Sequence, residues 1–359
     1  MSRFHSLKVT DVIMETKDAV SIGFEVPANL HEDFKYKQGQ YLTIKLNIEG
    51  EELRRSYSIC SSPTEEGQLR VAVKKVTGGK VSTYINDNIK VGDVLEVMVP
   101  MGSFYTEMNA NNTINYVLFA GGSGITPMIS ILKTALKEEP NSKVDLFYAN
   151  NAEASIIFKD EIASLAQANK ERLRVYLILN EAPDGQPNLL KGIMTKEKAQ
   201  ELIKTHVTIS ESNEYFVCGP GPMMENVSTA LKSLNLNENK IHIEYFTSPV
   251  AEELDNTSTT VSAVNDSKHS ATIVLDEETH QVELEENESI LDAAIRIDID
   301  PPYACQGGSC STCKALLEDG EVKMDATFGL SPKEIKKKYI LTCQSKPTTQ
   351  HVTVNFDKA

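Results

Sequence analysis

The sequence has no apolar run approaching the roughly 20 residues that a helix needs to cross a bilayer. Its first residues, Met1 to Lys8, also lack the apolar stretch of a secretory signal and lead directly into strand-like sequence. These two absences predict a protein that uses no membrane partner, and we expect it to work in the cytoplasm.

Positive charge is scarce along the chain. Lys and Arg together number 36 against 51 Asp and Glu, which gives a formal net charge of −15 over 359 residues. A nucleic-acid partner requires a basic surface that neutralises phosphates, so we expect no nucleic-acid partner. A protein partner would have to present basic groups, although an acidic surface also serves solubility alone.

Histidine pairs with metal-ligand spacing are also missing, and the cysteines carry the strongest signal instead. Cys305, Cys310 and Cys313 follow the C-x4-C-x2-C spacing of plant-type [2Fe–2S] proteins, with Cys343 further along as a fourth ligand. Thiolates are the soft ligands that such clusters require, and the glycines of 306–309 let backbone N–H groups approach the cluster sulfurs. Zinc usually takes two C-x2-C units, of which only one is present. Zinc, or four unrelated core cysteines, remain the alternatives.

Residues 1–110 predict a β-barrel domain. Short segments up to about residue 108 alternate polar and apolar residues at period two, with Gly, Pro or Asn between them. Many such strands in succession are typical of an antiparallel barrel. The clearest segments are 21–26, 41–46, 69–76 and 94–99.

Residues 111–248 predict a doubly wound α/β domain. The run 116–120 is continuously apolar, as expected for a strand buried on both faces of a parallel sheet. Further strand patterns alternate with helical patterns, which favours a parallel sheet with helices on both faces. The predicted strands are 144–148, 174–179 and 214–217, and the predicted helices are 127–138, 158–169, 196–204 and 223–234.

The last part of the chain divides in two. Residues 249–268 are polar and acidic without periodicity, which predicts a linker. Residues 269–359 predict a small α+β domain with a hairpin, a short helix at 290–297 and further strands.

Two glycine-rich turns in the α/β domain predict a nucleotide site. Gly121, Gly122, Ser123 and Gly124 lie between a strand and a helix that continues through Thr126 and Pro127, and the second turn contains Cys218, Gly219, Pro220 and Met223. Small residues let a pyrophosphate approach the backbone N–H groups at a helix N-terminus. Two such turns at carboxyl ends of strands would frame a crevice. A pair of turns without a ligand remains the alternative.

Two segments of the predicted barrel suggest a flavin site. Arg55 can pair with a phosphate, Tyr57 can lie against a flavin, and Ser58 can donate to its ring. The glycines 78–79 with Ser82 and Thr83 offer backbone and hydroxyl donors to a pyrophosphate. By composition alone these segments could equally be ordinary surface turns.

These motifs occur in the order seen in ferredoxin-NADP⁺-reductase-like flavoproteins, which the whole chain resembles. The appended cysteine domain is similar to the plant-type [2Fe–2S], β-grasp domain of electron-transfer components of bacterial multicomponent oxygenases. The resemblance implies FAD in the barrel, a nicotinamide nucleotide on the two glycine-rich turns, and a [2Fe–2S] cluster on the four cysteines. The FAD contacts that it implies are Arg55, Ser56, Tyr57, Ser58, Val73, Lys75, Gly79, Lys80, Val81, Ser82 and Thr83.

The resemblance also implies a reaction centre and a relay. Cys218 and Glu244 would lie near the nicotinamide, with Ser58, as catalytic groups, and Phe246 would approach the flavin. Hydride carries two electrons and a [2Fe–2S] cluster accepts one, so a flavin is needed between them. We therefore expect an NAD(P)H-dependent reductase that passes electrons through FAD and the cluster to an oxygenase component. A reductase for a different acceptor and a sensor protein are the alternatives.

The sequence gives weaker signals for the coenzyme preference and for the surface that docks the partner. NADPH is expected from the family, but 150–151 is Asn-Asn where relatives often have an arginine for the 2′-phosphate, so NADH remains possible. Lys159 or Lys143 could replace that arginine. Residues 269–359 are acidic in sum, which suggests that their acidic side meets a basic oxygenase surface.

Overall fold

The structure is a computed structural model that describes residues 4–65, 67–246 and 269–359. The chain forms two compact units: Phe4–Glu244, and a second unit whose described residues are Tyr245, Phe246 and 269–359. The predicted linker, 249–268, lies outside the described residues. None of the described helices combines the length and apolarity that a membrane crossing would require.

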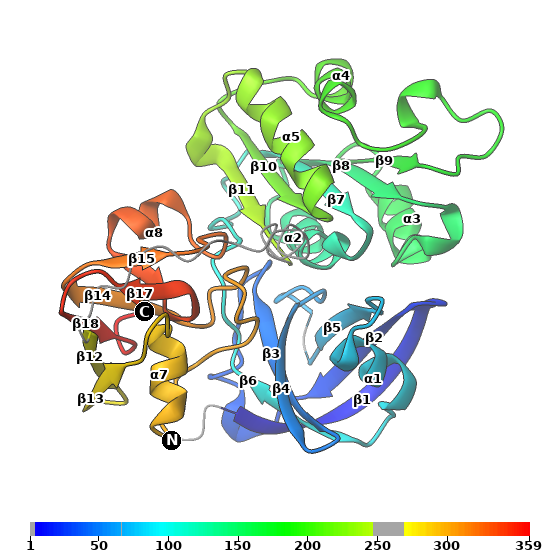
Figure 1. Cartoon of the computed structure of the whole chain (residues 1–359). Coiled ribbons are helices and arrows are strands. Elements are labelled where there is room, and N and C mark those ends of the chain that lie inside the picture. The colour runs from blue at the N-terminus through cyan, green and yellow to red at the C-terminus, as the bar shows by residue number, and fades with distance from the viewer. Residues whose placement is uncertain (1–3, 66, 247–268) are drawn as a thin grey trace. The chain divides into compact units, whose positions relative to one another are not determined.

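The first part of the larger unit is a six-stranded antiparallel sheet in the order β4-β3-β6-β1-β2-β5 (Figure 1). Ile59, directly after β4, pairs with Val71 of β5, so the two edges of the sheet meet and the expected barrel closes. The alternating apolar side chains, such as Leu7, Ile22 and Leu42, fill its core. Its strands are β1 (Phe4–Thr16), β2 (Ala19–Glu25), β3 (Tyr41–Ile48), β4 (Glu51–Ser58), β5 (Leu69–Lys74) and β6 (Val94–Met98).

A helix, α1 (Lys80–Asn88), interrupts the barrel strands. The expectation of strands alone up to residue 108 is therefore wrong at this segment. Val81 and Ile85, four residues apart, are buried against the barrel, and this tertiary burial outweighs the modest helix propensity of Val and Thr.

The second part of the larger unit is a parallel five-stranded sheet in the order β11-β10-β7-β8-β9. Starting at β7, the chain adds β8 and β9 on one side and then returns to add β10 and β11 on the other. The topological switch point therefore lies between β7 and β10. The strands are β7 (Asn115–Gly121), β8 (Lys143–Asn150), β9 (Leu173–Leu179), β10 (Asn213–Cys218) and β11 (Ile241–Glu244).

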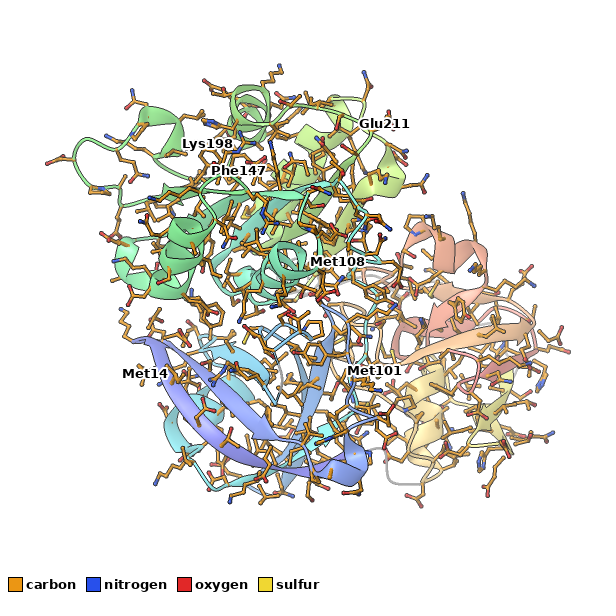
Figure 2. The ribbon with its side chains drawn as sticks, turned by 180° about the vertical axis from the view of Figure 1, so that it is seen from behind. Met14, Met101, Met108, Phe147, Lys198 and Glu211 are labelled. Carbon is orange, nitrogen blue, oxygen red and sulfur yellow. The ribbon has the colours of Figure 1, made fainter. Side chains whose placement is uncertain are left out.

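Helices cover both faces of this sheet, as the predicted doubly wound fold requires. Leu146 and Tyr148 pack towards α2 and α3, whereas Phe147, labelled inside the domain in Figure 2, points to the other face. There it stacks between Phe119 and Tyr176, with ring centroids 4.9 Å away on each side. The helices are α2 (Ile125–Glu138), α3 (Lys159–Ala168), α4 (Lys196–His206) and α5 (Gly221–Ser233).

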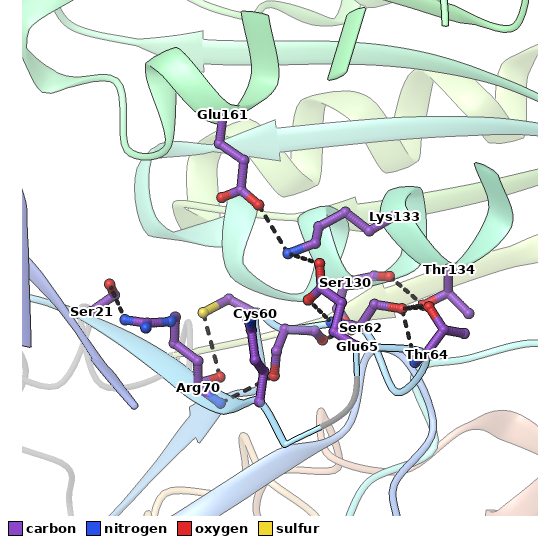
Figure 3. A network of polar contacts seen from close by, with 12 residues as sticks. Ser21, Cys60, Ser62, Thr64, Glu65, Arg70, Ser130, Lys133, Thr134 and Glu161 are labelled. Carbon is purple, nitrogen blue, oxygen red and sulfur yellow. Dashed lines mark hydrogen bonds and ion pairs between the residues drawn. The ribbon is translucent and has the colours of Figure 1, made fainter. Parts of the chain in front are cut away.

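The barrel and helix α2 are joined by a polar network (Figure 3). Ser130 on α2 donates to the Ser61 carbonyl at 2.6 Å, and the Lys133 ammonium pairs with Glu65 of the barrel at 2.8 Å. Lys133 also pairs with Glu161 of α3 at 2.9 Å, so one side chain links three segments. The network fixes α2 relative to the barrel.

The second unit contains a mixed five-stranded sheet in the order β13-β12-β18-β14-β16, and helix α7 packs against it. β12 pairs antiparallel with β13 and parallel with β18, as in the expected α+β domain. Its elements are β12 (His269–Leu275), β13 (Glu278–Leu284), α7 (Ile290–Arg296), β14 (Lys314–Asp319), β15 (Val322–Met324), α8 (Pro332–Lys336), β16 (Tyr339–Leu341), β17 (Ser345–Pro347) and β18 (His351–Asn355).

Candidate functional site

The two glycine-rich turns meet at the switch point of the parallel sheet. A Cβ atom added to Gly124 would lie 2.1 Å from the Cys218 carbonyl oxygen, and one added to Gly219 would lie 3.0 Å from the Gly121 Cα. Gly122 has a φ of +52°, in the left-handed region that favours glycine. The backbones of the two turns are therefore in contact, which only residues without a side chain permit.

Two helix N-termini face this junction. α2 begins directly after Gly124 and α5 directly after Pro220, so both present backbone N–H groups at the carboxyl end of the sheet. The Tyr148 hydroxyl donates to the Gly122 carbonyl at 3.0 Å, and the Thr126 hydroxyl donates to the Ser123 carbonyl at 3.0 Å. These bonds hold the first turn in shape and leave its N–H groups to a ligand. The arrangement fits the pyrophosphate of a dinucleotide.

The segment around Gly79 is a helix start rather than a simple turn. Gly79 is the N-cap of α1, and the Ser82 hydroxyl accepts from the Val76 N–H at 3.1 Å. Val81 lies in the barrel core and Lys80 pairs with Glu51, so the donors that remain in the first turn are its backbone N–H groups and the exposed Thr83 hydroxyl. These groups could donate to a phosphate, and the pyrophosphate contact of this segment remains a prediction.

The predicted flavin contacts on β4 and β5 differ in what they can offer. Arg55 is exposed and its guanidinium donates to the Arg54 carbonyl at 2.7 Å, while Tyr57 is partly buried against the barrel core. Ser56 shares a 3.2 Å hydrogen bond with the Thr43 hydroxyl. Val73 is fully buried in the barrel and its carbonyl accepts a hydrogen bond from the Asn86 amide at 3.1 Å, so its contact with a cofactor remains a prediction.

Lys74, at the end of β5, is a cation near the first glycine-rich turn that the sequence did not predict. The Lys74 ammonium lies 3.5 Å from the position of a Cβ on Gly122, so this barrel residue reaches the first glycine-rich turn. Lys75, which was predicted, pairs instead with Asp87 of α1. The motif itself carries no signal for Lys74, because its position depends on how the barrel meets the parallel sheet.

Ser58, Cys218 and Glu244 come together from three different strands. The Ser58 hydroxyl donates to a Glu244 carboxyl oxygen at 3.2 Å, and Cys218 is the direct neighbour of Glu244 in the β10–β11 pairing. Burial raises the pKa of Glu244 from 4.5 to about 8, although the hydrogen bond from Ser58 opposes the shift. Burial, and then the nearby Glu244 carboxyl, raises the pKa of Cys218. Both shifts favour the protonated forms, a neutral Glu244 carboxyl and a neutral Cys218 thiol.

Phe246 lies outside this trio, in the second unit, where its side chain is 38% exposed. Its neighbour Tyr245 packs its ring against Phe328 of the same unit, with centroids 5.0 Å apart. The approach of Phe246 to a flavin remains a prediction.

The four clustered cysteines form two pairs. The Cys310 and Cys305 sulfurs lie 3.2 Å apart, and Cys313 is hydrogen-bonded to Cys343. The hydrogen bond from Cys310 lowers the pKa of Cys305 to about 5, and that from Cys313 lowers the pKa of Cys343. The same contacts raise the pKa of Cys310 and of Cys313, so in each pair one thiol is shifted towards the thiolate, the form that binds iron, and its partner away from it.

The surrounding loop is shaped for a sulfur-rich group. The N–H groups of Gly307 and Cys310 both point at the Cys305 sulfur, at 3.4 Å each. In the described ranges, no three His, Cys, Asp or Glu side chains gather as the ligands of one metal ion would. Two pairs of thiols match a cluster of two irons with two cysteine ligands each. These residues fit a [2Fe–2S] cluster.

The two lysines that could replace the missing arginine at the coenzyme 2′-phosphate are not placed to do so. Lys143 begins β8, at the end of the sheet opposite to the glycine-rich turns, and Lys159 pairs with Glu153 at 2.7 Å. Asn150 and Asn151 lie at the correct end of β8, and Asn151 accepts a hydrogen bond from Asn180 at 2.8 Å. The Asn150 amide nitrogen is buried without a partner among the described residues.

Two glycine-rich turns at a switch point, a barrel in the same unit and a four-thiol loop are the arrangement expected of an NAD(P)H-dependent flavin and iron–sulfur oxidoreductase. Comparisons with known proteins support the same class of protein. The chain matches the family models described as "Oxidoreductase FAD-binding domain" over residues 6–105, "Oxidoreductase NAD-binding domain" over 118–229 and "2Fe-2S iron-sulfur cluster binding domain" over 273–348. The expected cofactor classes are thereby confirmed.

Full-length relatives carry the same arrangement. The chain is 40% identical to a subunit of 1,2-phenylacetyl-CoA epoxidase from Escherichia coli, covering 99% of each chain. It is 35% identical to the ferredoxin reductase component of 3-ketosteroid-9-alpha-monooxygenase from Rhodococcus rhodochrous, covering 99% of this chain and 97% of the relative. Phthalate dioxygenase reductase has the same fold, with a TM-score of 0.60 at 21% identity over 98% of each chain.

The chain therefore belongs to the family of three-domain flavin and iron–sulfur reductases. Its activity is the transfer of electrons from NAD(P)H through FAD and a [2Fe–2S] cluster, as the sequence predicted.

Proposed function

We propose that this reductase delivers its electrons to an oxygenase component, namely the di-iron epoxidase that acts on phenylacetyl-CoA in aerobic phenylacetate catabolism. The observation that carries the proposal is the 40% identity to a subunit of phenylacetyl-CoA epoxidase over 99% of both chains, cluster domain included. Other relatives serve a steroid monooxygenase and a glycine betaine monooxygenase, which supports an oxygenase acceptor in general. A ring-hydroxylating dioxygenase or a hybrid-cluster protein is the alternative acceptor. We place this reaction in the cytoplasm, where NAD(P)H is the common reductant.

We assign the barrel the task of holding FAD. Bound there, FAD supplies a centre that accepts hydride and releases electrons singly. The first-turn N–H groups of α1 would bind its pyrophosphate, with Gly79 allowing a close approach. Arg55 and Tyr57 would bind its phosphate and ring, and Lys74 would offset the phosphate charges of whichever nucleotide reaches Gly122.

The nicotinamide nucleotide would lie across the two glycine-rich turns of the switch point. We propose NADPH as the preferred coenzyme, with NADH also accepted. Asn150 and Asn151 offer amides rather than charge to the adenosine ribose, so we expect only a modest preference. Replacing Asn151 with arginine should lower the KM for NADPH and leave the KM for NADH unchanged.

Ser58, Cys218 and Glu244 would form the reaction centre. The protonated Glu244 carboxyl and the neutral Cys218 thiol put no negative charge beside a hydride donor, and the Ser58 hydroxyl fixes the carboxyl. Glu244 can hold and release a proton close to pH 8.

The domain division that we propose is 1–110 for FAD, 111–248 for the nucleotide, 249–268 as linker and 269–359 for the cluster.

The proposed acceptor is tested by reconstitution. NADPH, the reductase and the purified epoxidase oxygenase component should together convert phenylacetyl-CoA to its epoxide, with NADPH consumed in proportion to product. A dioxygenase component in place of the epoxidase serves as the comparison. Failure to support epoxidation while ferricyanide reduction proceeds would show a competent reductase with a different acceptor.

A further inference from the structure

In the cluster domain, most of the basic side chains that form no ion pair with a described residue lie together. Residues 269–359 contain sixteen Asp or Glu against nine Lys or Arg. Four of the nine basic side chains are neutralised in ion pairs, with Glu288, Glu334, Asp325 and Glu318 as partners. Of the five that form no ion pair with a described residue, four lie on or directly beside helix α8: Lys333, Lys336, Lys337 and Lys338.

These four residues, which we call the α8 lysine cluster, form an exposed surface with an apolar centre. All four side chains are exposed, and Ile335 in their midst is 40% exposed. A capping box between Ser331 and Glu334 fixes the start of the short helix. The four cations form no ion pair with the described residues, so they give this surface a positive potential that attracts an acidic partner, and Ile335 adds an apolar contact at its centre.

The α8 lysine cluster is attached to the cysteine loop. Just before α8, the Gly329 N–H donates to the Gly308 carbonyl at 2.8 Å, and Leu330 packs with Cys313 and Cys343. Lys314, the residue after Cys313, bonds Glu334 of α8 at 3.0 Å. The helix is therefore held beside the iron–sulfur site by backbone, apolar and ionic contacts.

Acidic residues gather at the opposite edge of the same sheet. α8 contacts β16, the last strand in the order β13-β12-β18-β14-β16, whereas the β12–β13 hairpin forms the other edge. Figure 1 shows α8 and β13 at opposite ends of this unit. The acidic residues at that far edge are Asp276, Glu277, Glu278, Glu283, Glu285 and Glu286. Most of the positive charge that forms no ion pair with described residues thus lies beside the iron–sulfur site, and an acidic edge lies across the sheet from it.

We propose that the α8 lysine cluster, with Ile335 at its centre, is the docking surface for an acidic patch on the protein that accepts the electron. The inference rests on the proposed function, since it assumes a protein acceptor. An acidic patch is attracted to the α8 lysine cluster and repelled by the far hairpin, so the approach is steered to the side where the iron–sulfur site lies. Burial of Ile335 then stabilises the encounter. This replaces the sequence-based hypothesis that the acidic side of the domain docks.

The test is charge reversal on the full-length holoprotein. The variant K336E/K337E is compared with K204E/K232E, which makes the same change in net charge on exposed residues of α4 and α5. Electron transfer from NADPH is measured to the epoxidase oxygenase component and to an acidic flavodoxin, over a range of ionic strength. Ferricyanide reduction and the cluster EPR signal report whether the relay within each variant is intact.

We expect K336E/K337E to lower kcat/KM for both protein acceptors by about tenfold at low salt and to abolish the salt dependence, with K204E/K232E close to wild type. Ferricyanide reduction should be unchanged. Basic cytochrome c should be reduced at least as fast by K336E/K337E as by wild type. Unaltered transfer to flavodoxin in K336E/K337E would overturn the proposal. Wild-type transfer to flavodoxin but none to the oxygenase would refute the proposed acceptor and leave the docking surface supported.

Discussion

The junction of the two glycine-rich turns, where we propose that the nucleotide binds, and the cysteine loop are built in opposite ways. At the junction, two turns touch through bare backbone, with Gly124 leaving no room for a Cβ atom beside Cys218. At the loop, four particular sulfurs are gathered in pairs and backbone N–H groups point at one of them. The first site depends on side chains that are absent and the second on side chains that are present. Adding one methyl group should damage the first, and removing one sulfur should damage the second.

The largest effect is expected from loss of a cluster ligand. Cys343→Ser removes one sulfur from the second pair, so the cluster should not assemble stably. Transfer to a protein acceptor should fall to below about 1% of the wild-type rate, while the flavin-dependent reduction of ferricyanide by NADPH continues. A stopped-flow comparison of the two acceptors, with EPR of the cluster, measures this. Equal loss of both activities would show that the cysteine loop also supports the flavin half.

The next effect follows from adding a methyl group at the junction of the two turns. Gly124→Ala should push the two turns apart, lower the free energy of unfolding by about 1–3 kcal/mol and raise the KM for NADPH, with the cluster signal unchanged. Gly221→Ala is the matched control, because nothing lies within 4 Å of its added Cβ. Thermal unfolding and initial rates provide the two readouts. An unaltered KM in Gly124→Ala would contradict the contact between the turns.

A smaller effect is expected where the barrel holds α2 in place. Lys133→Met leaves Glu65 and Glu161 without their shared cation, and both are partly solvated, so we expect a loss of about 1–2 kcal/mol in unfolding free energy. Lys137→Met, on an exposed position of the same helix, should cost less than about 0.5 kcal/mol. Denaturant unfolding of both variants is the measurement. Equal stability of the two would mean that the network in Figure 3 does not join the domains.

The smallest effect concerns Glu244 and pH. Its pKa rises from 4.5 to about 8 on folding, so the folded state holds a proton that the unfolded chain releases, and stability must fall as pH increases between these values. Because the side chain is partly accessible, we expect a decrease on the order of 1 kcal/mol. Glu244→Gln should remove this part of the pH dependence. Identical unfolding profiles from pH 5 to pH 8.5, about the window of the shift, would argue against a protonated Glu244.

The same contrast explains what the sequence could predict. The cysteine loop was predictable because residue type and spacing carry its chemistry, although the pairing of Cys305 with Cys310 was not. The meeting of the two glycine-rich turns was predictable in outline, since Gly121–Gly124 and Cys218–Gly219 follow strands of one sheet. Lys74 and the Lys133 network were not, because they depend on how the barrel meets α2. Helix α1 was missed because tertiary burial of Val81 and Ile85 outweighs their local preference.

The most direct test of the relay is an anaerobic titration of the holoprotein with NADPH and then NADH, following flavin absorbance and the cluster EPR signal together. The account predicts that the flavin bleaches and a reduced [2Fe–2S] signal grows in the same titration. A flavin that bleaches while the cluster stays oxidised, or a protein that binds no flavin, would contradict the proposed path of the electrons.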